Sequence, residues 1–453
     1  MSVHLLHYSD LETGLDSPGQ CARLAGEIAA RRDPETLVVG TGDNTAPGAL
    51  SLATEGEAAL DFFRAVEPDG DTFGNHEFDF GPERARELAG LAPQPWLCAN
   101  VTVDGHRFAE DETTPHRLVE AGEMVGLVGV AHPRTAELNP GLGMLSFEDP
   151  VPVVREHAAR LRAAGATRVV VLSHGGHTDE RIAAETDVDA VLGGHVHDIF
   201  TDVIDGTAVV RPGRGGQSFA ELRLGSRPAA EVHEVGDDHV DESLATRLRD
   251  RLAATGLDRS VATAEEPIPR TETTTTVAES AIGNVVVDAI RWQSGADIAL
   301  SPPGAIRSGN PLQGAVTAAD LVALTPYEDE LLTVELPGER LREAFVAVPF
   351  GYHDDGHPEE FCSHVSGATV VWDDDAGELL QARVDGDPVV ADRRYTVGVP
   401  EYLVETDHVN DAFGPGDVVS QHGKARDAIV AYAREQGLDP TLDGRIRRPA
   451  LGE

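Results

Sequence analysis

Cysteine and long apolar runs are scarce in this sequence. The three cysteines, Cys21, Cys98 and Cys362, are isolated from one another. This spacing fits neither a disulfide framework nor a Cys-x-x-Cys metal site. No stretch approaches the roughly 18 apolar residues of a membrane helix, and residues 1–8 lack the charged and apolar regions of a signal peptide. We therefore expect a cytoplasmic protein that does not bind membranes.

Lysine and aromatic residues are also rare, since Lys424 is the one lysine and aromatics make up 5% of the chain. By contrast, 78 Asp and Glu residues outnumber 36 Lys and Arg residues, and the net charge of −42 is spread over the whole length. The negative electrostatic field of such a chain repels the phosphates of nucleic acids, which argues against nucleic-acid partners. A small anionic substrate therefore needs cations close to its binding site. The composition is typical of adaptation to high salt, where the Debye length falls to about 3 Å. An ordinary acidic cytosolic protein is the alternative.

The order of apolar and helical segments predicts two α/β domains, because 453 residues exceed one ordinary core. In the first half, helical stretches at Gln20–Arg32, Gly81–Ala89 and Val154–Ala164 alternate with strand-like runs. We expect a layered α/β domain over residues 1–235, a linker with a helix over 236–276, and a second α/β domain over 277–453. The strand-like runs of the first half are Val3–His7, Thr36–Gly40, Met124–Ala131, Val169–Ser173, Ala190–Leu192 and Ala208–Arg211.

Metal-ligand side chains follow several of these runs, where open α/β sheets place their ligands. Carboxylates and imidazoles together suit a pair of divalent cations, since carboxylates neutralise and bridge the ions while imidazoles bind Zn²⁺ or Mn²⁺. Taken singly each motif is weak, and a Gly-Asp pair is often only a turn. Together they predict a metal site. The clusters are Asp10-Leu11-Glu12, Gly42-Asp43-Asn44, Gly74-Asn75-His76-Glu77-Phe78-Asp79, Ser173-His174-Gly175-Gly176-His177 and Gly193-Gly194-His195-Val196-His197.

In this order the clusters resemble the motifs of the calcineurin-like metallophosphoesterases. The form with Gly-Asn-His-Glu-Phe-Asp and a long second domain is similar to the 5'-nucleotidase and 2',3'-cyclic phosphodiesterase family. The resemblance implies two divalent metals, most simply Mn²⁺ or Zn²⁺, with Asp43 bridging them. It also implies a catalytic dyad of His76 and Asp79, in which His76 protonates the leaving oxygen or stabilises developing charge. The implied metal ligands are Asp10, Asp43, Asn75, His174, His195 and His197.

One residue departs from the family pattern, because Glu12 stands where the usual first cluster has a histidine. A Glu12 carboxylate that binds a cation makes the site more anionic and favours Mn²⁺ over Zn²⁺. Alternatively, Glu12 is a solvated carboxylate at a strand end and the first metal lacks a ligand. We favour coordination and count Glu12 among the predicted metal ligands.

The second half resembles the substrate domain of the same family. Residues 279–290 match its opening helix, and Ser301-Pro302-Pro303-Gly304-Ala305-Ile306-Arg307 stands at its Asn-Gly-Gly-x-x-Arg-like turn. The resemblance implies that Arg307 contacts the anionic substrate, as a bidentate guanidinium can. It also implies that Phe361 and Phe413 clamp the base, since stacking tolerates any base. A surface role for Arg307 and core roles for both phenylalanines are the alternatives.

These observations favour hydrolysis of nucleoside monophosphates at the phosphomonoester bond. Hydrolysis of 2',3'-cyclic nucleotides or nucleotide sugars is the alternative on the same site, and a sulfur-ester hydrolase shares the architecture. A silent nucleotide- or metal-binding protein is the alternative of another class. The expected partner is a small nucleotide, with no nucleic acid and no membrane.

Overall fold

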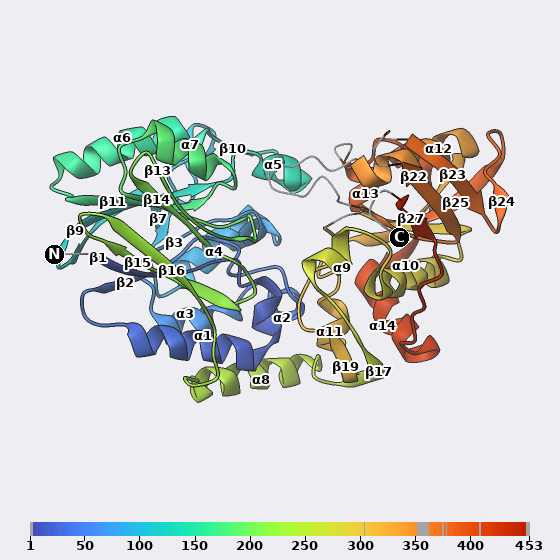
Figure 1. Cartoon of the computed structure of the whole chain (residues 1–453), viewed down its shortest axis with the longest axis horizontal. Coiled ribbons are helices and arrows are strands. Elements are labelled where there is room, and N and C mark those ends of the chain that lie inside the picture. The colour runs from blue at the N-terminus through green and yellow to red at the C-terminus, as the bar shows by residue number, and fades with distance from the viewer. Residues whose placement is uncertain are drawn as a thin grey trace. The chain divides into compact units, whose positions relative to one another are not determined.

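The computed structural model describes residues 3–302, 304–350, 362–373, 376, 378–406 and 409–449. The chain divides into two compact units, Met1–Thr255 and Gly256–Glu453 (Figure 1). Residues 236–276, expected as a linker with a helix, contain α8 (Glu242–Thr255) in the first unit and β17 (Ser260–Ile268) and α9 (Glu272–Thr276) in the second. Within the described ranges, no helix has the length and apolar character needed to cross a membrane.

Two sheets face each other in the first unit. A shared core of apolar side chains from both sheets fills the space between them, with Leu5 and Val39 from one sheet and Leu127 and Leu172 from the other. The smaller sheet has the order β16-β15-β1-β2 and the larger has the order β13-β14-β12-β11-β9-β8. Their strands are β1 (Val3–Tyr8), β2 (Thr36–Gly40), β15 (Ser218–Leu224), β16 (Pro228–Glu234), β8 (His116–Ala121), β9 (Glu123–Ala131), β11 (Arg168–His174), β12 (Ala190–Gly193), β13 (Ile199–Ile204) and β14 (Thr207–Pro212).

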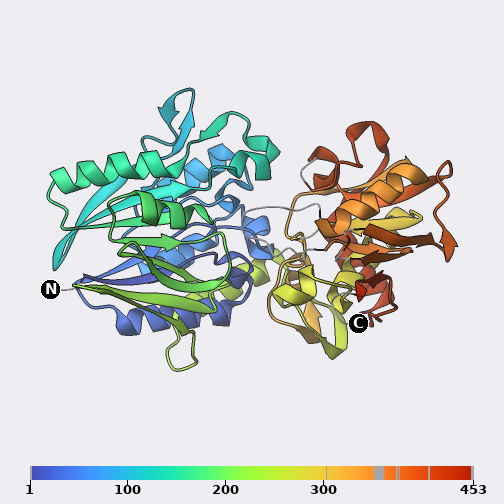
Figure 2. The same cartoon turned by 45° about the horizontal axis from the view of Figure 1, so that its top comes forward.

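Helices cover the outer faces of both sheets, which gives the layered α/β domain expected from the sequence. On one side lie α1 (Pro18–Arg31), α3 (Ala59–Val66) and α8, and on the other lie α6 (Pro150–Ala163) and α7 (Thr178–Glu185). Figure 2 shows the blue α1 and the blue-green α6 on opposite sides of the strands. An Asp149 side chain caps the start of α6, where it accepts a hydrogen bond from Val151 N.

Central strands of the larger sheet are buried on both faces because they are parallel and covered on each side. Strand β11 pairs in parallel with β9 and β12, and β12 pairs in parallel with β14. The run Arg-Val-Val-Val-Leu-Ser-His of β11 is rich in β-branched residues and almost wholly buried, as this position requires. The carboxyl ends of these strands therefore meet at one edge of the sheet.

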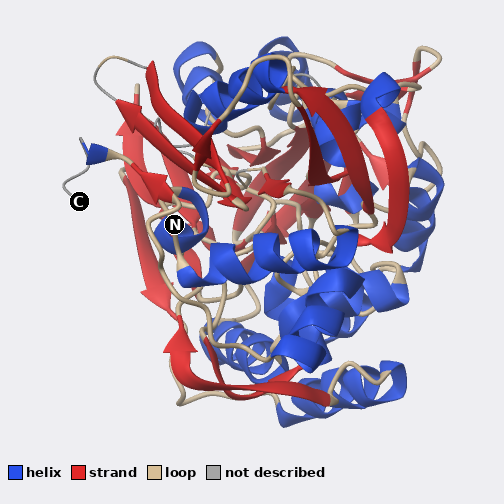
Figure 3. Ribbon diagram, turned by 90° about the vertical axis from the view of Figure 1, so that its right-hand side faces the viewer, coloured by secondary structure: helices blue, strands red, loops and turns tan. Residues whose placement is uncertain are grey.

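The second unit combines a five-stranded sheet of order β21-β18-β25-β20-β26 with a four-stranded sheet of order β24-β23-β22-β27 (Figure 3). Helix α10 (Ala281–Ser294) begins at a Ser280 cap and ends at Gly295 in the left-handed region. It packs with α14 (Ala425–Gln436) and α11 (Ala318–Val322) in one apolar core. The strands are β18 (Ile298–Ser301), β20 (Glu330–Pro337), β21 (His364–Ser366), β22 (Ala368–Asp373), β23 (Glu378–Val384), β24 (Asp387–Pro388), β25 (Arg394–Pro400), β26 (Val418–Lys424) and β27 (Ile446–Arg447).

Candidate metal centre

The structure brings together side chains that lie far apart in the sequence of the first unit. Asp10 and Glu12 follow β1, Asp43 follows β2, and Asn75 and His76 follow β3 (Asp71–Thr72). His174 ends β11, and His195 and His197 follow β12. Three overlapping groups of donor atoms result, each compact enough to surround one cation: Asp43, His174 and His195; Asp10, Glu12 and His197; and Glu12, Asp43 and His76.

Unusual backbone angles mark the loops that carry these groups. Asp10, Glu12, Asp43 and His195 adopt φ angles of 50°, 45°, 52° and 72°. Each such residue costs about 1–3 kcal/mol, so the conformation persists only where the surroundings hold it. Hydrogen bonds from Asp10 N to Gly42 O (3.1 Å) and from Glu12 N to Asp43 O (3.2 Å) tie two of these loops together. The loops are therefore held in place by the protein chain itself.

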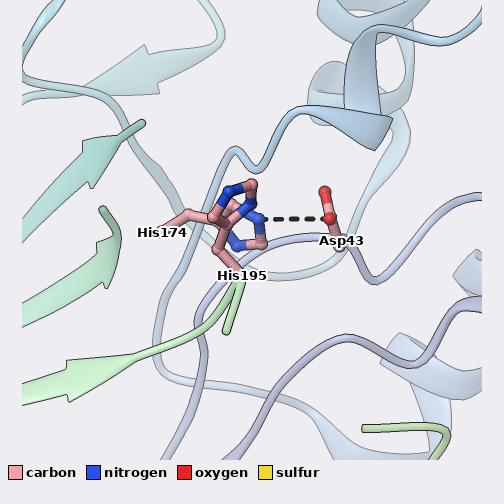
Figure 4. Close-up of side chains that lie close together, drawn as sticks. All are labelled: Asp43, His174 and His195. Carbon is pink, nitrogen blue, oxygen red and sulfur yellow. Dashed lines mark ion pairs between the residues drawn. The ribbon is translucent and has the colours of Figure 1, made fainter. Parts of the chain in front are cut away.

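The first group consists of Asp43, His174 and His195 (Figure 4), of which Asp43 and His174 are buried. His174 Nδ1 lies 2.7 Å from the Thr41 carbonyl oxygen, so this nitrogen is the donor. Its Nε2 lies 3.1 Å from Asp43 Oδ2, and within the described part of the chain it has no hydrogen-bond partner. At this distance a protonated His174 ring forms an ion pair with Asp43, and a neutral ring places both atoms where they could bind the same cation. His195 adds Nδ1, which lies 2.9 Å from Asn75 Oδ1.

The pKa values of Asp43 and His174 reflect the attraction between the carboxylate and the imidazolium. Burial disfavours the charged imidazolium of His174, but the Asp43 carboxylate outweighs burial and raises the pKa of His174 to about 10. Burial likewise opposes ionisation of Asp43, yet His174 and His76 together hold the pKa of Asp43 well below its usual range. Asp43 is therefore ionised and paired with the imidazolium of His174.

The second group combines two carboxylates with one imidazole. His197 Nε2 lies 3.3 Å from Glu12 Oε1 and 3.6 Å from Asp10 Oδ1. Glu12 is only 2% exposed, so it is not the solvated carboxylate that the sequence left open. Arg214 stands beside this group, with Nη1 2.8 Å from His197 Nδ1 and 4.0 Å from Glu12 Oε2. A buried carboxylate pair of this kind is costly without a cation.

His76 and Asp79 lie next to both groups. The ring Nδ1 of His76 is 3.0 Å from each oxygen of Asp79, which makes Nδ1 the donor and leaves Nε2 on the opposite side of the ring. The His76 backbone N–H donates to Asp43 Oδ1 at 2.8 Å. The sequence-predicted dyad is thus joined to the carboxylate that belongs to two of the donor groups.

The donor atoms fit divalent metals. One group offers two imidazoles and one carboxylate, and the other offers two carboxylates and one imidazole, a mixture that suits ions such as Zn²⁺ and Mn²⁺. The buried His174 Nε2 and the buried Glu12 carboxylate both face other donor atoms rather than apolar packing.

Glu77 is a supporting residue to which the sequence analysis gave no role, although it lies within the Gly-Asn-His-Glu run. Its buried carboxylate accepts hydrogen bonds from the backbone N–H groups of Asp43 (2.8 Å), Thr45 (3.0 Å) and Gly74 (2.6 Å). Burial, together with the Asp43 charge, raises the pKa of Glu77 to about 7. Glu77 therefore fixes two ligand loops at once. A glutamate directly after His76 was the only sequence signal for this contact.

Asp71 and His132 are further supports to which sequence reasoning assigned no role in the site. Asp71 accepts hydrogen bonds from Tyr8 Oη (3.1 Å) and Gly42 N (3.1 Å) below the loop that carries Asp43. The His132 ring stacks on the His195 ring with centroids 4.5 Å apart. His132 follows β9 at the same sheet edge as the other ligands, which is the signal that could have indicated it.

Arg307 lies on a turn in the second unit, and its side chain is buried rather than on the surface. The residue is 8% exposed, and its guanidinium carbon lies 5.8 Å from the centre of the Tyr327 ring. Arg270 fixes this turn by donating from Nη2 to the carbonyl oxygens of Arg307 and Ala323, each at 3.0 Å. The Arg307 guanidinium is therefore buried against an aromatic ring, at a distance within the range of a cation–π contact.

Of the two phenylalanines predicted to clamp a base, the structure describes Phe413 alone. Phe413 belongs to the apolar core of the second unit together with Val409, Ala412 and Phe345, which is the core placement that the sequence left open. Its stacking role stays a prediction. Phe361 lies outside the described residues.

Comparisons with known proteins give the family. Residues 3–198 match the family model described as calcineurin-like phosphoesterase, and residues 260–414 match that of the 5'-nucleotidase C-terminal domain. The chain is 22% identical to Endonuclease YhcR of Bacillus subtilis over 88% of this chain and 36% of that protein. It is 27% identical to human 5'-nucleotidase over 42% of this chain and 37% of that protein. The matches thus span little more than a third of these relatives.

Solved structures share the whole fold. The 5'-nucleotidase precursor of Thermus thermophilus has a TM-score of 0.86 at 20% identity, covering 99% of each chain. Sulfate thiohydrolase SoxB of Thermus thermophilus has a TM-score of 0.81 at 21% identity, covering 99% of this chain and 97% of that chain. At about 20% identity this likeness concerns the fold, and the chain therefore has the two-domain architecture of these structures.

The chain contains a calcineurin-like phosphoesterase domain over residues 3–198 and a 5'-nucleotidase C-terminal domain over residues 260–414. The family resemblance and the fold class predicted from the sequence are confirmed. Calcineurin-like phosphoesterases use a dinuclear centre of divalent metals.

Proposed function

We propose that this protein hydrolyses nucleoside 5'-monophosphates to a nucleoside and phosphate, using two divalent metals. The observation that carries the proposal is the arrangement of donor groups, in which Asp43 and Glu12 link two cation positions beside the His76–Asp79 pair. Asp43, Asn75, His174 and His195 would hold one cation. Asp10, Glu12 and His197 would hold the other, with Asp43 between them.

The residues around the cations then have separate tasks. When bound, two divalent cations supply Lewis-acid polarisation of the phosphoryl group and neutralise its charge. Hydrolysis replaces the bond between phosphorus and the ester oxygen with a bond to a water oxygen, so the leaving oxygen needs a proton. His76 supplies that proton from Nε2, while Asp79 holds Nδ1 and stabilises the imidazolium. Asn75 contributes a neutral oxygen that adds no charge to repel the phosphate.

Arg307 is the proposed contact for the substrate anion. The catalytic unit is rich in carboxylates and the chain carries a net charge of −42, so an anion needs a fixed cation. A guanidinium held by Tyr327 and by the Arg270-supported turn meets that need at little entropic cost.

Hydrolysis of several esters by one preparation tests this function. Metal-stripped protein would be assayed in high salt with AMP, a 2',3'-cyclic nucleotide, a nucleotide sugar and an aryl phosphate, after Mn²⁺ or Zn²⁺ is returned. Metal-dependent phosphate release, fastest from AMP, is the expected result. Preference for a cyclic ester or a nucleotide sugar would change the substrate and keep the site. Absence of turnover in protein that holds two metals would favour a silent binding protein.

A sulfur ester is the second substrate class to include, because the protein resembles SoxB of Thermus thermophilus over nearly its whole length. A thiosulfate ester in the same assay separates the two chemistries. Release of sulfate without release of phosphate would replace the nucleotidase proposal.

Glu12 should control which metal activates the protein. Replacing Glu12 with Gln removes one charge and keeps an oxygen donor, and we expect Mn²⁺ affinity to fall by at least about tenfold. Glu12→His should raise the ratio of Zn²⁺-supported to Mn²⁺-supported turnover, because imidazole suits Zn²⁺ better than a carboxylate does. Calorimetric titration and turnover with each metal measure both effects. Glu83→Gln, at a side chain that is 85% exposed, is the control. Unchanged metal preference in both Glu12 variants would remove Glu12 from the ligand set.

Arg307 should determine substrate affinity and not metal content. We expect Arg307→Ala to raise the KM for AMP by about 10- to 100-fold, because a hydrogen bond to a charged group contributes about 1.5–3 kcal/mol. Steady-state kinetics and metal analysis measure the two properties together. Arg434→Ala, at an exposed position of α14, is the control in the same unit. A normal KM in the Arg307 variant would make the arginine structural.

High salt should stabilise the protein, which tests the halophilic assignment; the cytoplasmic assignment stays a prediction. Salt screens the mutual repulsion of the acidic residues, so we expect the unfolding midpoint to rise by at least about 4 °C between about 0.1 M and about 2 M KCl. Thermal unfolding followed by circular dichroism gives the midpoint, and sucrose of matched osmolality is the uncharged control. A midpoint that is flat or falls with KCl speaks for an ordinary acidic protein.

A further inference from the structure

Arg211 is a fully buried charged residue for which the sequence and the proposed reaction provide no role. It lies near the end of β14, is 2% exposed, and packs its guanidinium over the Phe200 ring with 4.5 Å between the guanidinium carbon and the ring centre. Burying a guanidinium is costly unless anions surround it. The carboxyl groups around Arg211 come from the loop after β12 and from the first turn of α7, which follows the His174 segment.

One anion is Asp198, which directly follows the candidate ligand His197. Arg211 Nε donates to Asp198 Oδ1 at 2.8 Å. Because Asp198 and His197 are adjacent, this contact fixes the end of the loop formed by residues 194–198. Phe200, two residues after Asp198, pairs with Arg211 across the β13–β14 ladder, so the loop leads directly into the strand beside Arg211.

The other acidic residues are Asp179 and Glu180 in the first turn of α7. Arg211 Nη2 lies 3.1 Å from Glu180 Oε1, and Nη1 lies 3.6 Å from Asp179 Oδ2. Asp179 in turn accepts a hydrogen bond of 2.6 Å from the Ser173 hydroxyl, and Ser173 directly precedes His174. The Ser173 oxygen also accepts from Gly175 N at 3.0 Å. Arg211 thus reaches the loop formed by residues 173–177 through Asp179.

The cluster lies directly against β12, the strand between the two loops. A side chain at Gly193 would collide with both Asp179 and Arg211, so glycine is required there. Gly193 ends β12, and His195 follows two residues later. Arg211 therefore stands beneath the chain segments that carry His174, His195 and His197.

We propose that Arg211 is a positioning residue that holds the 173–177 and 194–198 loops in one fixed arrangement, so that both cation positions depend on it. The inference rests on the proposed two-metal function. The 194–198 loop carries His195 toward one cation position and His197 toward the other. Arg211 contacts Asp198 in that loop and reaches Ser173, the neighbour of His174, through Asp179. Outer residues that orient metal ligands typically change metal affinity by about 10- to 100-fold.

The test compares Mn²⁺ binding in matched variants by calorimetric titration and metal analysis of the full chain. In Arg211→Gln, both binding steps should weaken by about 10- to 100-fold. Asp198→Asn should weaken mainly the step that involves His197, and Ser173→Ala mainly the step that involves His174. Arg211→Lys keeps the positive charge but lacks the planar set of guanidinium N–H donors, so it should give intermediate Mn²⁺ affinities. Arg223→Gln, at a side chain that is 59% exposed, is the control and should bind as the unaltered protein does.

The outcomes separate this inference from the proposed function. If the unaltered protein does not bind two Mn²⁺ ions, the two-metal function itself fails. If it binds two and Arg211→Gln weakens neither step or only one, the role of Arg211 is overturned. Circular dichroism shows whether Arg211→Gln is folded. If it is not, the double variant Ser173→Ala, Asp198→Asn replaces it, and retention of both affinities in that variant overturns the proposal.

Discussion

Replacing His76 with Asn should leave both metals bound and lower turnover of AMP by about 100- to 10,000-fold, the range that a general acid contributes. The reason is geometric. Asp79 occupies Nδ1 of His76, so the opposite ring nitrogen is the one that reaches a leaving oxygen. Asn keeps a polar side chain of similar reach but cannot donate a proton as an imidazolium does.

Metal content and turnover must be measured on the same preparation of the His76 variant. Asp79→Asn is the second variant, and it should lose less activity because His76 remains while its imidazolium is less stabilised. His106→Asn serves as the control, since this histidine is exposed on β6 (His106–Arg107) of the same unit. Loss of a metal from the His76 variant would show that His76 is a ligand.

Replacing Asp43 with Asn should abolish the dinuclear centre. Asp43 belongs to two of the three donor groups, lies 3.1 Å from His174 Nε2, and accepts from His76 N at 2.8 Å. The amide keeps the size of the side chain but removes the charge that neutralises two cations. We expect metal affinity and turnover each to fall by more than about 100-fold. This loss exceeds the roughly 10- to 100-fold effect of residues that only hydrogen-bond to metal ligands.

Metal analysis after dialysis and a titration with Mn²⁺ measure the Asp43 effect. Asp33→Asn is the matched control, because Asp33 is exposed at the opposite end of β2, before the strand begins. Two tightly bound metals in the Asp43 variant would contradict the bridging role. One retained metal would show that Asp43 serves a single position.

The sequence predicted the layered domain and the clustering of the ligand loops because these depend on local patterns. Each of Asp43, His174 and His195 follows a short apolar run, and the carboxyl ends of parallel strands meet at one edge. The burial of Glu12 was not predictable, because it depends on where the loops after two different strands meet. The Arg211 cluster was missed for the same reason, since Asp179, Asp198 and Arg211 are brought together only by the sheet order.

The second unit was less predictable at the level of side chains. Its strands and the helix α10 follow from apolar periodicity and from the Ser280 cap. The stacking of Arg307 on Tyr327 depends instead on how the turn after β18 packs against the chain beyond α11. For Phe413, apolar character alone does not distinguish a core position from a base-stacking position.

The strained loops of the metal centre have a consequence for how the protein can change. Asp10, Glu12, Asp43 and His195 hold left-handed conformations that glycine adopts without strain. A glycine at any of them would relieve that strain while deleting a donor atom, so selection for stability alone would dismantle the site. Sequences that have drifted free of catalysis should therefore carry glycine or asparagine at these positions first, and such changes would record the loss of activity in related chains.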